Sequence, residues 1–164
     1  MTHPVAESRD IAAPADRVWA MVSDLPRMGE WSPENQGGRW VKGDGRAIGS
    51  VFRGRNRNGI RRWSTTARVV EVEPGRSFEI AITFAGFPVA NWRYEFEDTP
   101  QGCRVTESWR DNRATVQRAL GRPMGDHSGA HARKEMAATL VKLAAAAEKD
   151  ATMPAEPAPT PPPA

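Results

Sequence analysis

The chain has 164 residues, of which 39% are hydrophobic and 26% are charged, and its formal net charge is only +3. This size supports one domain with a hydrophobic core, and no stretch approaches the roughly 20 apolar residues that cross a bilayer. The N-terminal residues form no apolar run of signal-peptide length, and the single cysteine, Cys103, cannot make an internal disulfide or by itself hold a metal. We therefore expect a cytoplasmic protein without a membrane span.

The N-terminal part predicts one strand followed by two short helices. Residues 5–11 have the composition of a strand, and Pro14 with Asp16 begins an amphipathic helix that carries Val18 and Val22. The segment 24–26 interrupts this helix, so a second short helix should follow, ending at about residue 30.

Residues 38–112 predict strands and turns only. Glycine-, proline- and asparagine-containing turns separate six predicted strands, at residues 39–42, 50–57, 60–72, 77–85, 89–97 and 104–111. Consecutive strands with short turns indicate an antiparallel meander, and their alternation gives it one apolar, aromatic face. The strand at 60–72 has an ambiguous phase, because Val69 and Val72 cannot both face inward without a β-bulge.

Residues 128–148 predict the only long amphipathic helix. One stripe of this helix is apolar, and Ser128 or Asp126 is placed to cap its N-terminus. The buried stripe should consist of Ala132, Met136, Leu140, Leu143 and Ala147. Before it, residues 114–120 could form a helical turn. We interpret residues 1–150 as one domain and residues 151–164 as a disordered tail rich in proline and alanine.

The order strand, two short helices, six strands and one long helix resembles the START-like, or SRPBCC, superfamily, and within it the bacterial polyketide cyclase/dehydrase-like branch. The resemblance runs from about residue 5 to residue 148 and is carried by residues 14–19, 30–33, 49–56, 62–63, 70–76, 92–96 and 102–108. It implies an α+β helix-grip fold, in which a curved antiparallel sheet of about seven strands wraps around the long C-terminal helix.

The resemblance also implies an apolar ligand pocket between the sheet and the long helix. The pocket would be entered near the two short helices and the neighbouring loops, and the inward-facing strand positions would supply its walls. The predicted pocket residues are Trp31, Phe52, Trp63, Ile82, Phe84, Trp92, Tyr94, Trp109, Met136 and Leu140. Packing in the core is the competing interpretation for each aromatic side chain.

Glu107 is the candidate for chemistry. Alternation places it on the same face as Val105 and Trp109, where loss of solvent would raise the pKa of its carboxyl and suit a general acid or base. Alternatively, Glu107 accepts hydrogen bonds from a neighbour such as Tyr94 and has a structural role.

Three further residues have the spacing of a metal-binding helix stripe. His127, His131 and Glu135 lie four positions apart, but the helical wheel directs them away from the apolar stripe. We therefore interpret them as solvated residues and assign no metal site and no cofactor.

The positive charge is concentrated at Arg53, Arg55, Arg57, Arg61 and Arg62. The alternation of the first three is typical of the solvated face of a strand, although such a patch could also dock an acidic carrier protein. No nucleic-acid-binding motif accompanies the arginines.

These observations leave two main functional hypotheses for a monomer or weak homodimer. The first is a protein that binds a hydrophobic small molecule, such as a lipid or a polyketide. The alternative is an aromatase/cyclase or dehydratase that acts on polyketide-like substrates, using the pocket shape and Glu107 as acid or base. An interaction module that uses the outer sheet face and the proline-rich tail is the weakest hypothesis.

Overall fold

The computed structural model describes residues 4–114 and 128–151. The elements follow in the order β1 (Val5–Ile11), α1 (Ala15–Ser23), the 3-10 helix η1 (Leu25–Glu30), β2 (Asn35–Lys42), β3 (Val51–Asn58), β4 (Arg61–Glu73), β5 (Ser77–Phe84), β6 (Phe87–Thr99), β7 (Gly102–Asp111) and α3 (Gly129–Ala151). The predicted helical turn at 114–120 falls almost entirely, and the tail after residue 151 entirely, outside the described residues.

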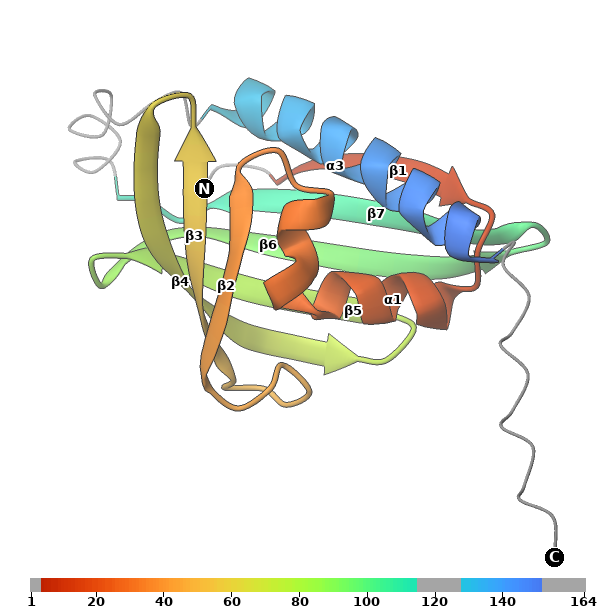
Figure 1. Ribbon diagram of the computed structural model, residues 1–164, viewed down its shortest axis with the longest axis horizontal. Coiled ribbons are helices and arrows are strands. Elements are labelled where there is room, and N and C mark those ends of the chain that lie inside the picture. The colour runs from red at the N-terminus through yellow and green to blue at the C-terminus, as the bar shows by residue number, and fades with distance from the viewer. Residues whose placement is uncertain (1–3, 115–127, 152–164) are drawn as a thin grey trace, which may run out of the picture.

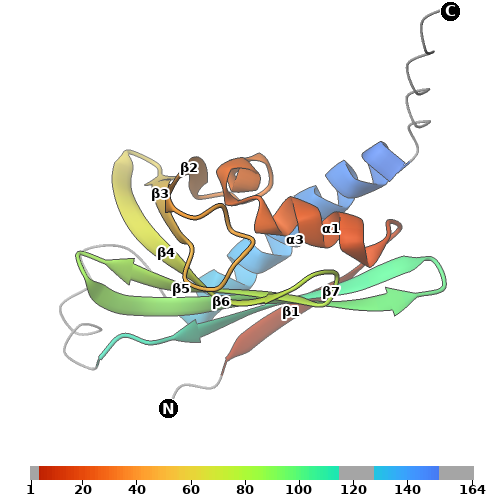
Figure 2. The same cartoon turned by 90° about the horizontal axis from the view of Figure 1, so that it is seen from below.

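All seven strands form one antiparallel sheet in the order β1-β7-β6-β5-β4-β3-β2. Strands β2 to β7 are a simple meander, and β1 joins the far edge by pairing with β7. The helices lie on one side of this sheet, and β2 to β4 curl towards that same side (Figures 1 and 2). The predicted α+β helix-grip fold is therefore confirmed.

The bulge in β4 is also confirmed. The pairing of β4 with β5 shifts register between Val69 and Glu71. Because one extra residue is inserted, Val69 is fully buried and Val72 still packs against the core. The bulge therefore allows both valines to contribute to a single apolar face.

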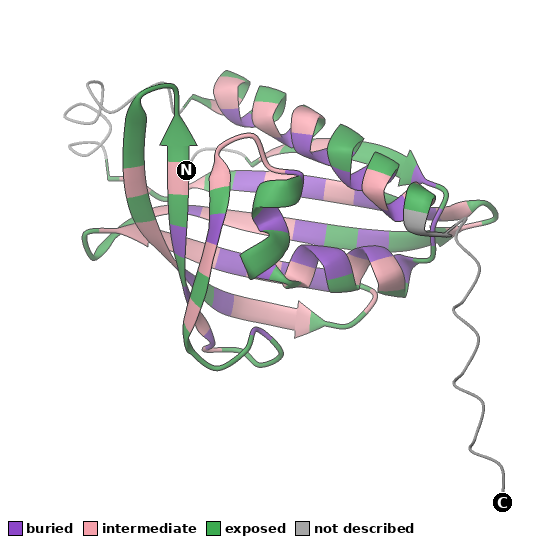
Figure 3. Cartoon of the chain, viewed as in Figure 1, coloured by how far each residue is buried: buried purple, intermediate pink, exposed green. Residues whose placement is uncertain are grey.

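Helix α3 covers the sheet with the predicted stripe. Ala132, Met136, Leu140, Leu143 and Ala147 are all buried, and Figure 3 shows the buried positions of α3 on its side facing the sheet. The backbone N–H of His131 donates to Ser128 Oγ at 3.2 Å, which is the expected N-terminal cap.

The core has two parts. The larger cluster joins α1, η1 and the C-terminal half of α3 to the central strands, and the smaller one consists of Ala90, Trp109, Ala132 and Met136. Among the described helices, none is both long and apolar enough to cross a bilayer.

Candidate ligand-binding site

A cavity of about 200 Å³ lies between the inner sheet face, η1 and the N-terminal half of α3. Most of its wall surface is apolar and aromatic, as is usual for small-molecule sites, although many polar side chains also line it. The lining residues are Leu25, Met28, Ser32, Glu34, Asn35, Phe52, Gly54, Asn56, Trp63, Thr65, Ala67, Ile80, Ile82, Val89, Ala90, Trp92, Tyr94, Glu107, Trp109, Arg113, Ser128, His131, Ala132, Glu135 and Thr139.

Glu107 is the most deeply buried acidic residue of this wall, with only 2% of its surface exposed. It lies opposite Tyr94 in the pairing of β6 with β7, and the Tyr94 hydroxyl donates to Glu107 Oε1 at 2.6 Å. The other carboxyl oxygen, Oε2, has no hydrogen-bond partner in the described part of the protein. Both interpretations of Glu107 therefore have a structural basis, since Oε1 accepts a hydrogen bond from Tyr94 and the buried Oε2 has no partner among the described residues.

Burial raises the pKa of Glu107 to about 8, and the charge of Glu135 adds to this effect. The hydrogen bond from Tyr94 acts in the opposite direction, because it stabilises the ionised carboxylate. At neutral pH the carboxyl group is therefore mostly protonated, and a protonated Oε2 is a hydrogen-bond donor without a partner among the described residues.

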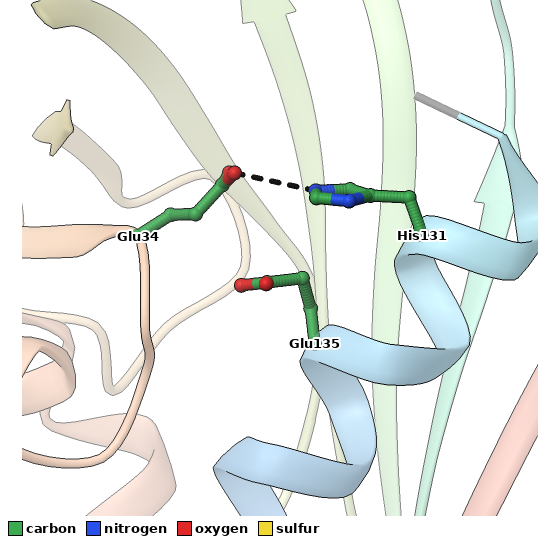
Figure 4. Close-up of side chains that lie close together, drawn as sticks. All are labelled: Glu34, His131 and Glu135. Atoms are coloured by element: carbon green, nitrogen blue, oxygen red, sulfur yellow. Dashed lines mark hydrogen bonds and ion pairs between the residues drawn. The ribbon is translucent and has the colours of Figure 1, made fainter. Parts of the chain in front are cut away.

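A cluster of three polar side chains lies on another part of the cavity wall, where Glu34 faces His131 and Glu135 (Figure 4). Glu34 precedes β2, while the other two residues lie one turn apart on α3. His131 Nε2 is 3.3 Å from Glu34 Oε1. Burial raises the pKa of Glu135, and the neighbouring charge of Glu34 raises it further.

The interpretation of His131 and Glu135 as solvated residues is wrong. Both are half-buried and line the cavity. A helical wheel assumes a flat contact surface, whereas this sheet curls towards the helices (Figure 2), so a flank of α3 also faces protein. His127 lies outside the described residues, and no sequence signal indicated that Glu34 would join this group.

Six of the ten predicted pocket residues lie along the cavity: Phe52, Trp63, Ile82, Trp92, Tyr94 and Trp109. Their inward positions follow from strand alternation, which sequence reasoning can read directly.

The other four predicted pocket residues do not line this cavity. Trp31 is fully buried, and its indole N–H donates to Met28 Sδ at 3.1 Å. Met136 belongs to the smaller core cluster and Leu140 to the larger one. Phe84 lies beyond a register shift between β5 and β6, next to the turn. A bulge changes the twist of a hairpin end, which explains why simple alternation fails there.

The arginine side chains of β3 are on the outer surface. Arg53, Arg55 and Arg57 are all exposed, in agreement with a solvated face. Arg55 Nη2 lies 3.4 Å from the Gln36 carbonyl oxygen, and Arg57 Nε donates to the Gly59 carbonyl at 3.0 Å.

The fold and the cavity together define a helix-grip protein with a partly enclosed, mostly apolar site. Residues 2–148 match the family model described as polyketide cyclase/dehydrase and lipid transport. The chain belongs to this family. A comparison with curated proteins gave no match.

Solved structures agree with this assignment. The polyketide-cyclase-like protein Cgl2372 from Corynebacterium glutamicum is 33% identical, with a TM-score of 0.58 over 91% of this chain and 93% of that one. Protein NE0264 from Nitrosomonas europaea has a TM-score of 0.68 at 18% identity over 92% and 97% of the two chains. The di-domain ARO/CYC StfQ of the steffimycin biosynthetic pathway has a TM-score of 0.67 at 15% identity, over 92% of this chain and 52% of that chain. The last two similarities show a shared fold.

Proposed function

We propose that this protein binds a compact hydrophobic molecule in the cavity and hydrogen-bonds one oxygen of that molecule through Glu107. The observation that carries the proposal is a buried carboxyl group on the wall of an aromatic cavity, whose Oε2 has no hydrogen-bond partner among the described residues. An unpartnered polar group in such a place costs free energy until a ligand satisfies it. A ligand carbonyl or hydroxyl oxygen would do so.

The size of the cavity restricts the ligand. About 200 Å³ is below the roughly 300–1,000 Å³ of sites for drug-sized molecules. Trp63, Trp92 and Trp109 line it with flat aromatic surface, which favours a compact ring system. Affinity would come mainly from apolar surface removed from water, and the Glu107 hydrogen bond would set the orientation.

The alternative is a polyketide cyclase or dehydratase type of enzyme, and the neutral state of Glu107 supports it. A protonated Glu107 can give its proton to a ketone oxygen of the substrate while the resulting carboxylate takes a proton from the adjacent carbon. The balance of this step is a keto to enol conversion, with Glu107 protonated again at its end. The enol carbon is then the nucleophile for ring closure, and the cavity shape would bring it close to a second carbonyl.

Native mass spectrometry of the purified chain, followed by denaturing extraction, tests the binding proposal first. A retained apolar molecule should appear as a mass increment that Trp63→Ala reduces and that Trp40→Ala leaves in place. Trp40 is a suitable control because it packs against Phe52 without lining the cavity. A chain that carries no molecule and also fails to bind any member of a panel of aromatic ketones and phenols would contradict the proposal.

The same panel separates binding from catalysis. With an aromatic ketone in deuterated water, an enzyme should exchange the protons on the carbon next to the carbonyl, as followed by NMR. Glu107→Gln should abolish this exchange and leave binding nearly unchanged, because the glutamine amide can still donate a hydrogen bond. In a simple binding protein, neither the unaltered chain nor the variant should show exchange. Glu79→Gln is the control, since Glu79 bonds to Arg93 away from the cavity.

A further inference from the structure

We propose that Glu34, His131 and Glu135 form a binding site for one divalent transition-metal ion, with Zn²⁺ as the expected occupant, on the wall of the cavity. The three residues offer one imidazole nitrogen and two carboxylate oxygens, and these atoms lie within 4.8 Å of one another (Figure 4). The site joins helix α3 to the segment that leads into β2. It goes beyond the proposed ligand binding and does not depend on it.

The geometry is close to that of a bound ion. Zinc binds histidine nitrogen and carboxylate oxygen at about 2.0–2.2 Å, which places two ligand atoms of the same ion roughly 3–4 Å apart. His131 Nε2 and Glu34 Oε1 are already 3.3 Å apart. The other two separations are at most 4.8 Å, so these atoms need to approach by no more than about 1–2 Å.

The surrounding contacts hold two of the three groups in place. Asn58 Nδ2 donates to Glu34 Oε1 at 2.7 Å, and the Arg57 backbone N–H donates to the Glu34 carbonyl at 2.8 Å. His131 lies in the first turn of α3, which is capped by Ser128. Outer contacts of this kind orient metal ligands.

The charges of the cavity supply a separate reason for a cation. Glu34 and Glu135 line the same cavity, and their carboxyl oxygens lie within 4.8 Å of each other. Among the described lining residues, the one guanidinium is that of Arg113, which is bound by Asp111 at 2.9 Å. The carboxyl groups of Glu34 and Glu135 thus share a partly enclosed space, and a divalent ion would offset the repulsion between them.

The mixture of ligands selects the class of metal. One imidazole with two carboxylates suits Zn²⁺, Co²⁺ or Mn²⁺, whereas it lacks the thiolates that select softer ions. With three protein ligands, a tetrahedral ion keeps one position open. Because the three residues line the cavity, that position could accept an oxygen of a molecule bound there.

A titration with Zn²⁺ tests the site. The full chain, free of any affinity tag and stripped with a chelator, should bind one equivalent in competition with a chromophoric chelator. Glu34→Gln, Glu135→Gln and His131→Gln should each lower the affinity at least about tenfold. Glu30→Gln and His127→Gln are the controls and should bind as the unaltered chain does, because Glu30 pairs with Arg27 and His127 is the other histidine close in sequence.

Two further measurements distinguish a loss of metal binding from a loss of folding in the variants. Zn²⁺ should raise the melting temperature of the unaltered chain but not of the His131→Gln variant, whose circular dichroism should be unchanged. Co²⁺ should give visible absorption bands that change when His131 is replaced. The absence of binding, binding that survives all three substitutions, or binding lost in His127→Gln alone would overturn the proposal. None of these readouts requires an organic ligand, so they are independent of the proposed function.

Discussion

The Tyr94 hydroxyl donates a 2.6 Å hydrogen bond to Glu107 Oε1, while Glu107 Oε2 has no partner in the part of the chain that the structure describes. The strand pairing positions this hydrogen bond, because Tyr94 and Glu107 lie opposite each other on β6 and β7. Burial first, and then the charge of Glu107, raise the pKa of the Tyr94 hydroxyl well above its usual value. Tyr94 is therefore a fixed hydrogen-bond donor, and Glu107 is the member of the pair that titrates.

The pH dependence of stability should report the pKa of Glu107. Its pKa is about 8 in the folded protein and near its usual value of 4.5 when unfolded. The folded state thus retains a proton that the unfolded state loses, and this contribution is complete below about pH 4.5 and is lost as the pH rises to about 8. Relative to Glu107→Gln, the unaltered chain should lose up to a few kcal/mol of unfolding free energy across this range.

Urea denaturation at about pH 5 and about pH 9 measures this difference. Glu79→Gln serves as the control, because Glu79 pairs with Arg93 and does not line the cavity, and its curve should run parallel to that of the unaltered chain. Parallel curves for Glu107→Gln as well would show that Glu107 ionises normally in the folded protein.

Tyr94→Phe should raise the pKa of Glu107 above about 8, because it removes the hydrogen bond that favours the carboxylate. Carbon NMR of the labelled carboxyl groups would follow the titration directly. The stability of this variant should also fall by about 1 kcal/mol, the usual net effect of one lost hydrogen bond. A lowered pKa would contradict the assigned direction of the Tyr94 bond.

Replacement of two tryptophans should separate the core from the cavity wall. Trp31 is fully buried, so Trp31→Ala should lower the unfolding free energy by about 3–5 kcal/mol. Trp63 is half-buried and lines the cavity, so Trp63→Ala should cost less stability and weaken binding of an apolar probe instead. Thermal melting and probe fluorescence measure the two effects. Equal losses of stability would argue that Trp63 is a core residue.

The arginines of β3 allow a test of docking to an acidic carrier protein, which stays a proposal. Arg55→Glu combined with Arg57→Glu should leave stability nearly unchanged, because both side chains are exposed. If an acidic carrier docks on this face, the double substitution should weaken its binding, and added salt should weaken binding to the unaltered chain. Binding to such a carrier that is insensitive to both changes would rule out this surface.

The sequence by itself determined the secondary structure, its order and the apolar face of each element. Local periodicity carries this information. The alternation of apolar and polar residues along each strand predicts, for example, that Trp92, Tyr94 and Glu107 face inward. It also led to the expected burial of Glu107, because a position between Val105 and Trp109 follows from the period of a strand.

Only the tertiary structure decided which inward residues fill the core and which border the cavity. Trp31 and Trp63 were equivalent candidates in the sequence, but packing buries the first completely and leaves the second on the cavity wall. The contact between Glu34 and His131 could likewise not be predicted from the sequence. These residues are far apart in the chain and are brought together by the curl of the sheet around α3. Local patterns specify the direction of a side chain relative to its own element, whereas the neighbours it meets depend on how the elements pack.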